Sequence, residues 1–172
     1  RVKVYDNACE FAAQTPTLPY YLSALGYSTT LSGKMHFIGA DQKHGFQERL
    51  TTDIYPSDFG WTPDWRQAIP GGATGLNLRS VVESGTCRRS LQLDHDDEAV
   101  FKAVQKLREL GRQTARPPFF LTVSLTHPHN PYVISPEYWD RYADDEIDMP
   151  ATPALPLDRH DPHSLRLRQI YK

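Results

Sequence analysis

The apolar run Phe119-Phe120-Leu121-Thr122-Val123-Ser124-Leu125 constrains the fold of this chain more than any other segment. It follows Pro117-Pro118 and ends at a polar loop, and its length suits a strand better than a helix. Nearly continuous apolar runs of this kind are typical of strands buried on both faces of a parallel sheet. We therefore expect residues 119–125 to form such a strand.

Helix patterns alternate with strand patterns along the rest of the chain. Residues 27–31, with one Tyr and two Thr, predict a second strand. Residues 17–26 predict a helix that ends at Gly26, and its apolar face consists of Leu18, Tyr21, Leu22 and Leu25. This alternation favours an α/β fold with a mostly parallel central sheet flanked by helices.

The clearest predicted helix covers residues 96–110. Asp94 or Asp96 can cap its N-terminus, and its apolar face is marked by Val100, Val104 and Leu107. A short helix is predicted near residues 136–142, and Asp161-Pro162 resembles the start of a final helix.

Composition and charge exclude several classes of protein. The formal net charge is −2 over 172 residues, without the basic stripe expected of a nucleic-acid-binding protein. No apolar run approaches the roughly 18–20 residues that span a bilayer, so we expect no membrane partner. The two cysteines, Cys9 and Cys87, do not form a disulfide scaffold, and a cytoplasmic location is favoured.

The ends of the chain indicate that it is part of something longer. It begins at Arg1 without an initiator Met and stops within the pattern of its last helix. At roughly 100–200 residues per domain, the length fits one domain or a large part of one. Because of the two ends, we expect residues 1–172 to be a partial domain of a larger protein.

The first candidate site is the segment Ser32-Gly33-Lys34-Met35-His36. If it stays extended, Lys34 and His36 point to the same side, since side chains alternate along a strand. An ammonium and an imidazole on one side could bind an anion. The alternative is a solvated Lys and a surface His at a strand end.

The second candidate site is the loop His127-Pro128-His129-Asn130-Pro131, which directly follows the apolar run. Its two histidines could be ligands of a metal such as zinc, or a general acid with a neighbour. A structural turn whose histidines bond to the backbone is the alternative.

An aromatic patch at residues 58–65 contains Trp61 and Trp65. Trp rings bind quaternary ammonium groups well, although a small satellite core explains the patch equally. Among the remaining polar residues, His44 and His95 are interpreted as structural or solvated, and residues 94–98 as a capped helix start rather than a metal site.

Together these segments resemble the sulfatase branch of the alkaline phosphatase superfamily. The resemblance rests on Gly33-Lys34-Met35-His36-Phe37, on His44-Gly45-Phe46 and on the Thr126-His127-Pro128-His129 segment. The long stretch 48–65, which includes Asp58-Phe59-Gly60-Trp61, is similar to the choline-sulfatase group of that family in particular. The similarity covers essentially the whole chain.

The resemblance implies hydrolysis of a sulfate ester, with choline sulfate as the expected substrate. Lys34 would contact the sulfate oxygens and His36 the hydrated aldehyde of a formylglycine nucleophile. His129 would stabilise or protonate the leaving oxygen, and Trp61 would hold the trimethylammonium group. A divalent cation, usually calcium, assists in this family.

The chain also departs from the family pattern. Neither Cys9 nor Cys87 lies in the Cys/Ser-x-Pro-x-Arg motif that yields formylglycine, and the acidic metal ligands are absent. We therefore expect the nucleophile and the calcium ligands to lie outside residues 1–172, and this chain alone to be inactive. Asn77 is an expected substrate-binding residue, but Leu76 precedes it where a His is expected.

Three alternatives remain open from the sequence. The chain could act on aryl sulfates or on phosphonate and phosphate esters, or it could be a non-catalytic remnant that still binds its ligands. A zinc site on His127 and His129 is the third. The full-length protein could form homo-oligomers.

Overall fold

The computed structural model describes residue 4 and residues 7–55 and 79–170. These residues belong to two compact units. The first unit comprises Arg1–Thr62 and Leu91–His127, and the second comprises Pro63–Ser90 and Pro128–Lys172. Each unit is described by itself.

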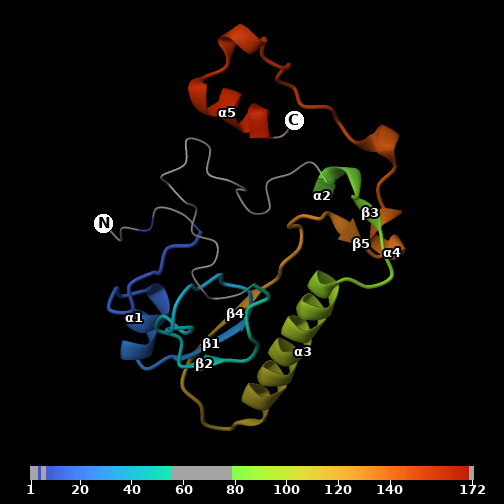
Figure 1. The fold of residues 1–172 in the computed structure, drawn as a ribbon. Helices are drawn as coiled ribbons and strands as arrows, with labels where there is room; N and C mark the ends of the chain where they lie inside the picture. The colour runs from blue at the N-terminus through green and yellow to red at the C-terminus, as the bar shows by residue number, and fades with distance from the viewer. Residues whose placement is uncertain (1–3, 5–6, 56–78, 171–172) are drawn as a thin grey trace. The chain divides into compact units, whose positions relative to one another are not determined.

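The first unit is built on a parallel sheet in the strand order β2-β1-β4 (Figure 1). The central strand is β1 (Ser28–Gly33), with β2 (Glu48–Arg49) on one side and β4 (Phe119–Ser124) on the other. Pairing between β1 and β4 runs from Ser28 opposite Phe119 to Gly33 opposite Ser124. The predicted parallel α/β arrangement is therefore confirmed for the described residues.

Strand β1 carries the core of this unit. Leu31, Thr29 and Ser32 are completely buried in it. Helix α3 (Leu91–Arg112) packs against β1 and β4, and the Ser32 hydroxyl donates to the Ala99 carbonyl oxygen over 2.7 Å. Because Ala99 and Ala103 are small, the helix can approach the sheet closely.

The predictions for α3 were partly wrong. The helix begins at Leu91, so Asp94 and Asp96 lie inside it and are not its cap. Its predicted apolar face at Val100, Val104 and Leu107 is exposed. The buried face is formed instead by the polar side chains of Gln92, His95 and Asp96, the small Ala99 and Ala103, and one large apolar residue, Leu110.

Helix α1 (Leu18–Ala24) lies close to its predicted position. Thr17 caps it by accepting from Tyr20 N, and Gly26 follows its end with a φ of 88°. Most of its predicted apolar face is exposed, however, with Leu18 at 60% and Leu25 at 75%, whereas Leu22 is partly buried. The helix is joined to β1 through polar contacts instead, including 2.8 Å between the hydroxyls of Ser23 and Thr29.

Strand β4 is less buried than its sequence predicts. Val123 is 44% exposed, and the remaining residues of the strand are only partly buried. The reason is its place in the sheet: among the described strands, β1 is flanked on both sides and β4 on one.

The second unit consists of short elements. Strands β3 (Gly85–Thr86) and β5 (Val133–Ile134) pair in parallel. Its helices are α2 (Arg79–Val82), α4 (Pro136–Trp139), the 3-10 turns η1 (Asp144–Glu146) and η2 (Leu157–Arg159), and α5 (Pro162–Ile170). Asp161 accepts from the backbone N–H groups of His163 and Ser164, as predicted for the start of the last helix.

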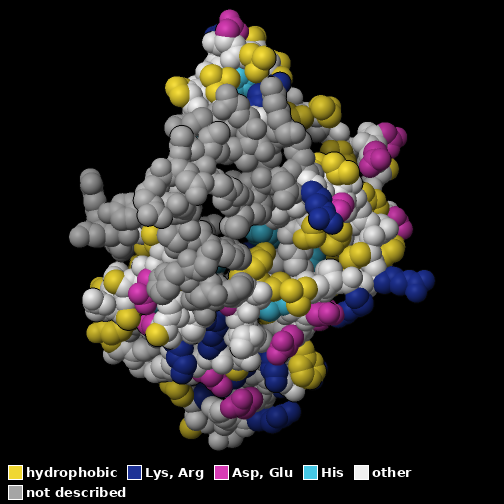
Figure 2. All heavy atoms as spheres, in the orientation of Figure 1, with side chains coloured by type: hydrophobic (Ala, Val, Ile, Leu, Met, Phe, Trp, Pro, Cys, Tyr) yellow, Lys and Arg dark blue, Asp and Glu magenta, His cyan; other side chains and the backbone are white. Residues whose placement is uncertain are grey.

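Within the described ranges, no helix is both long and apolar enough to cross a membrane. Lys and Arg side chains are interspersed with Asp and Glu on the surface shown in Figure 2. Both cysteines are free thiols and partly buried.

Candidate functional site at the strand ends

The turn after β1 carries Lys34 and His36, but it is not extended. Gly33 has a φ of 106° and His36 a φ of 56°, so the chain changes direction at both residues. A side chain at position 33 would collide with the carbonyl oxygen of Ser124 in the neighbouring strand. The predicted alternation of an extended segment is therefore wrong here, because the chain turns as soon as the strand ends.

Asp53 holds this turn in place. One of its carboxylate oxygens, Oδ2, accepts from the backbone N–H groups of Met35 at 2.9 Å and His36 at 2.7 Å. The guanidinium of Arg49 donates to the same oxygen over 3.1 Å, and both side chains are at least nine-tenths buried. The other oxygen, Oδ1, is buried without a hydrogen-bond partner among the described residues.

Lys34 projects from the turn over the ring of Tyr55. Its ammonium nitrogen lies 4.6 Å from the ring centroid. Burial lowers the pKa of Lys34 below its usual value, while the negative charges of Asp53 and Asp96 act in the opposite direction. The result is a half-buried cation at the carboxyl end of β1, where open α/β sheets bind ligands.

His36 and Tyr55 lie beside each other, with ring centroids 5.6 Å apart. The His36 ring nitrogen Nε2 is 2.9 Å from the carbonyl oxygen of Asn7. Because a carbonyl oxygen only accepts, this contact places a proton on Nε2. Lys34 and His36 therefore both contact the Tyr55 ring, each from its own position in the turn.

A second buried aspartate, Asp96 of α3, holds the turn after β4. Its Oδ1 accepts from Thr126 N at 2.5 Å and its Oδ2 from His127 N at 3.0 Å. The same Oδ2 is 2.6 Å from Nδ1 of the His127 ring. Burial would raise the pKa of Asp96, but these hydrogen bonds outweigh it and lower the pKa.

His95 of α3 contacts both the segment before Asp53 and the turn after β4. Its Nε2 is 3.3 Å from the carbonyl oxygen of Thr52, just before Asp53, and its Nδ1 is 3.3 Å from the Thr126 hydroxyl. The structural role predicted for His95 fits these contacts. Two adjacent parallel strands therefore end in turns that are each closed by one aspartate.

Sequence reasoning missed Asp53, Tyr55 and Asp96 as site residues. Asp96 was hidden because an acidic residue near a helix start resembles an N-cap. The available signal was its place in α3, since Asp96 precedes Ala99 and Ala103 at the spacing of one helical face.

The remaining candidates lie elsewhere. His129 belongs to the second unit, where its Nδ1 is 3.0 Å from the carbonyl oxygen of Asn130. Trp61 and Asn77 fall outside the described residues. Within the described part of the chain, no three His, Cys, Asp or Glu side chains are grouped to hold a metal ion, so neither a zinc nor a calcium centre is seen there.

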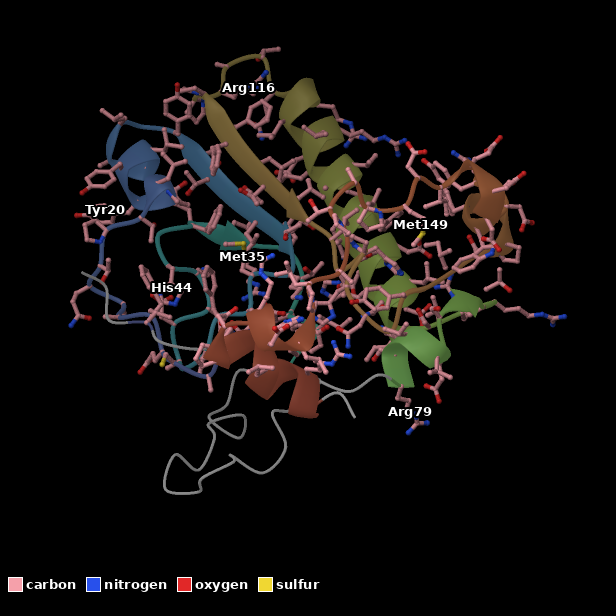
Figure 3. All side chains as sticks on the ribbon, turned by 90° about the horizontal axis from the view of Figure 1, so that it is seen from above. Tyr20, Met35, His44, Arg79, Arg116 and Met149 are labelled. Atoms are coloured by element: carbon pink, nitrogen blue, oxygen red, sulfur yellow. The ribbon has the colours of Figure 1, made fainter. Side chains whose placement is uncertain are left out.

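A separate aromatic cavity of about 350 Å³ lies in the first unit. Its lining includes Met35 and His44, which are labelled in Figure 3, together with Phe37 and Phe120. The His44 ring is buried and lies 4.3 Å from the Phe37 ring, centroid to centroid. This fits the structural role predicted for His44.

The two buried aspartates predict acid-sensitive stability. Hydrogen bonds lower the pKa of both Asp53 and Asp96 in the folded chain, although burial opposes them. Their contribution to stability should be complete above the unfolded value of about 3.9 and be lost as the pH falls through the folded value. Urea unfolding between about pH 6 and pH 2 would measure it. In Asp53→Asn, the free energy of unfolding should fall less between about pH 6 and pH 2 than it does in the parent protein. The same pH dependence in both proteins would show that Asp53 is not a source of the acid sensitivity.

Comparison with known proteins agrees with this geometry. The family model for sulfatases matches residues 3–170, and the chain belongs to the sulfatase family. It is 51% identical to a choline-sulfatase of Rhizobium meliloti (strain 1021) over 173 aligned positions, which cover 97% of this chain. The match covers 33% of the relative, so the chain spans about a third of its length.

Proposed function

We propose that this chain forms part of the active site of a sulfuric ester hydrolase. The observation that carries the proposal is the half-buried ammonium of Lys34, held at the carboxyl end of β1 by a turn that Asp53 closes. A partly desolvated cation at such a position suits a sulfate oxyanion. Membership of the sulfatase family and the similarity to a choline-sulfatase support the same function.

In this proposal, Lys34 binds the sulfate oxygens and His36 lies next to the reacting group. Asp53 keeps the backbone of Lys34, Met35 and His36 in one conformation. Tyr55 supports the Lys34 stem and limits its motion, because the ammonium rests over the ring. His129 is proposed to stabilise the leaving oxygen, as the family resemblance implies.

The proposed substrate is choline sulfate, with Trp61 holding the trimethylammonium group and Asn77 as a further binding residue. The relative's name and the aromatic character of residues 58–65 support this choice. A small-molecule ester, rather than a nucleic acid or a membrane, is the expected partner.

Replacing Trp61 by alanine tests the substrate. In a full-length sulfatase that carries these 172 residues, Trp61→Ala should raise KM for choline sulfate by about 30-fold, since a desolvated cation–π contact contributes about 2 kcal/mol. KM for an uncharged alkyl sulfate should change little. Trp139→Ala, at a half-exposed position of α4, is the control. Equal effects on both esters would contradict a role for Trp61 in choline recognition.

Calcium and formylglycine are proposed as cofactors from the family resemblance alone. The described residues do not fit a calcium site, because they contain no group of three carboxylate, His or Cys side chains. The ligands and the nucleophile would have to come from other residues, and no step above depends on them. Cytoplasmic location and self-association remain predictions from the sequence.

The direct test of the proposal measures sulfate released by the full-length protein. We expect release from choline sulfate and, more slowly, from other sulfate esters. Hydrolysis of phosphate or phosphonate esters in preference to sulfates would change the substrate class. No product from any of these esters would contradict the proposed function.

A further inference from the structure

Arg49 of β2 lies at the same sheet edge as Lys34 (Figure 1). The strands β1 and β2 run in parallel and Leu31 pairs with Arg49, so the two strands end side by side. The Arg49 side chain is only 8% exposed, and its guanidinium reaches the carbonyl oxygen of Gly33, the residue before Lys34, over 3.4 Å. Because a buried charge is costly unless its polar groups are bonded, the contacts of this guanidinium show what it does.

The guanidinium of Arg49 donates five hydrogen bonds, as many as it has N–H groups. Nε donates to the carbonyl oxygen of Thr51 over 2.9 Å. Nη1 donates to the backbone and side-chain oxygens of Gln42 over 3.0 Å and 2.9 Å. Nη2 donates to the Gly33 carbonyl oxygen and, over 3.1 Å, to Oδ2 of Asp53. Every acceptor belongs to this chain, so the guanidinium acts on the conformation of the chain rather than on a bound anion.

Gln42 links the guanidinium to the middle of the loop between β1 and β2. Its side-chain Nε2 donates to the carbonyl oxygens of Phe37 over 2.9 Å and Gly39 over 2.8 Å. Gly33, His36 and Gly39 have positive φ values of 106°, 56° and 97°, which belong to no regular strand or helix. The loop therefore depends on bonds to side chains for its backbone groups.

Arg49 and Asp53 fix the backbone on both sides of Lys34. The guanidinium binds the carbonyl oxygen of the preceding residue, Gly33, and the carboxylate accepts from the N–H of the following residue, Met35. The two side chains also bond to each other. Lys34 thus leaves the strand from a backbone that is held on both sides, which limits where its ammonium can lie.

We propose that Arg49 is a positioning residue of this site, which holds Lys34 where it binds the sulfate group, and that Gln42 extends this hold to the rest of the loop. The inference rests on the proposed hydrolysis of a sulfate ester, with Lys34 as the sulfate-binding residue. Arg49 does not touch the substrate. Its replacement should therefore change binding and turnover only through Lys34.

Replacing Arg49 by lysine tests this role in a full-length sulfatase that carries these 172 residues. Lysine keeps a positive charge beside Asp53, but its ammonium has three N–H groups and cannot replace five bonds in a planar arrangement. The value of kcat/KM for choline sulfate should fall by about 30-fold, since small displacements of a binding group lower rates by up to about 10²-fold. Inorganic sulfate should inhibit less well, with an inhibition constant about 10-fold higher, because it would bind to the same lysine.

The Lys34→Met background separates positioning from general support of the fold. If Arg49 acts through Lys34, Arg49→Lys should lower kcat/KM by less than about 5-fold once Lys34 has been replaced. A merely structural arginine would lower kcat/KM by the same factor in both backgrounds. Each variant is assayed well below its own unfolding temperature, so that lost stability is not measured as lost activity.

Arg112→Lys is the matched control. Arg112 is exposed in the last turn of α3, and the change should leave kcat/KM within about twofold of the parent protein. Gln42→Ala is the second test variant, because it removes the bonds to the middle of the loop and keeps the bond between Arg49 and Asp53. It should give a smaller loss than Arg49→Lys, and one that also shrinks in the Lys34→Met background. If Arg49→Lys does not fold, the two Gln42→Ala measurements decide by the same criterion.

The outcomes separate this inference from the proposed function. If the parent protein hydrolyses sulfate esters while Arg49→Lys keeps its kcat/KM and its inhibition by sulfate, this inference is overturned and the proposed function stands. An equal fall in both backgrounds would also overturn it. A parent protein that hydrolyses no sulfate ester would overturn both.

Discussion

Replacing Lys34 by methionine should lower kcat/KM for sulfate esters by about 10³-fold in a full-length sulfatase that carries these 172 residues. Methionine keeps the length and most of the apolar stem of lysine but removes the charge. The ammonium is half-buried over the Tyr55 ring, where a charge interacts more strongly with a bound anion than it does in water. Steady-state kinetics with choline sulfate would measure the effect.

Lys43→Met is the matched control for this prediction. Lys43 is exposed, and its ammonium donates to the carbonyl oxygen of Gln47 over 3.0 Å. We expect kcat/KM to stay within about twofold of the parent protein, since surface contacts of this kind contribute little. Comparable losses in the two variants would show that Lys34 acts through general charge and not through a bound sulfate.

Replacing Asp53 by alanine should lower the free energy of unfolding by about 3 kcal/mol or more. The change removes the acceptor of two backbone N–H groups in the turn after β1. It also leaves the buried guanidinium of Arg49 without its carboxylate partner, and an uncompensated buried charge is costly. Urea unfolding near pH 7 would measure the loss.

Two variants bracket the effect of Asp53. Asp148→Ala removes an exposed carboxylate in the second unit and should change stability by less than about 0.5 kcal/mol. Asp53→Asn keeps an acceptor oxygen for the turn but loses the charge. Its free energy of unfolding should therefore lie between those of Asp53→Ala and Asp148→Ala. If Asp53→Ala were as stable as the Asp148 control, Asp53 would not hold the turn.

The parallel sheet was predictable because its strands have strong local signals. The apolar run at 119–125 and the Tyr and Thr residues before Gly33 predict strands by their own composition. Lys34 and His36 were found for the same reason, since they directly follow a strand. Ligand sites gather at such ends in α/β sheets.

The helices show the limit of pattern reasoning. Periodicity predicts that a segment is helical, but only contacts decide which face is buried. In α3, Val100 and Val104 are exposed while Ala99 and Ala103 face the sheet. Small residues occupy that face because the helix packs closely on β1 and β4. Polar residues share the face because His95 and Asp96 make contacts with the turns that follow the strands.

By itself, the sequence determined the fold class, the strand that leads to Lys34 and the family resemblance that the comparisons confirm. The fold class, the strand and the family resemblance all depend on residues that are neighbours in the chain, so their order and spacing are enough to predict them. Only the tertiary structure decided that Asp53 and Asp96 close the two strand-end turns and that His127 has a carboxylate partner. Asp96 and His127 are 31 positions apart in the chain, and they meet because α3 packs across two parallel strands that end at the same edge.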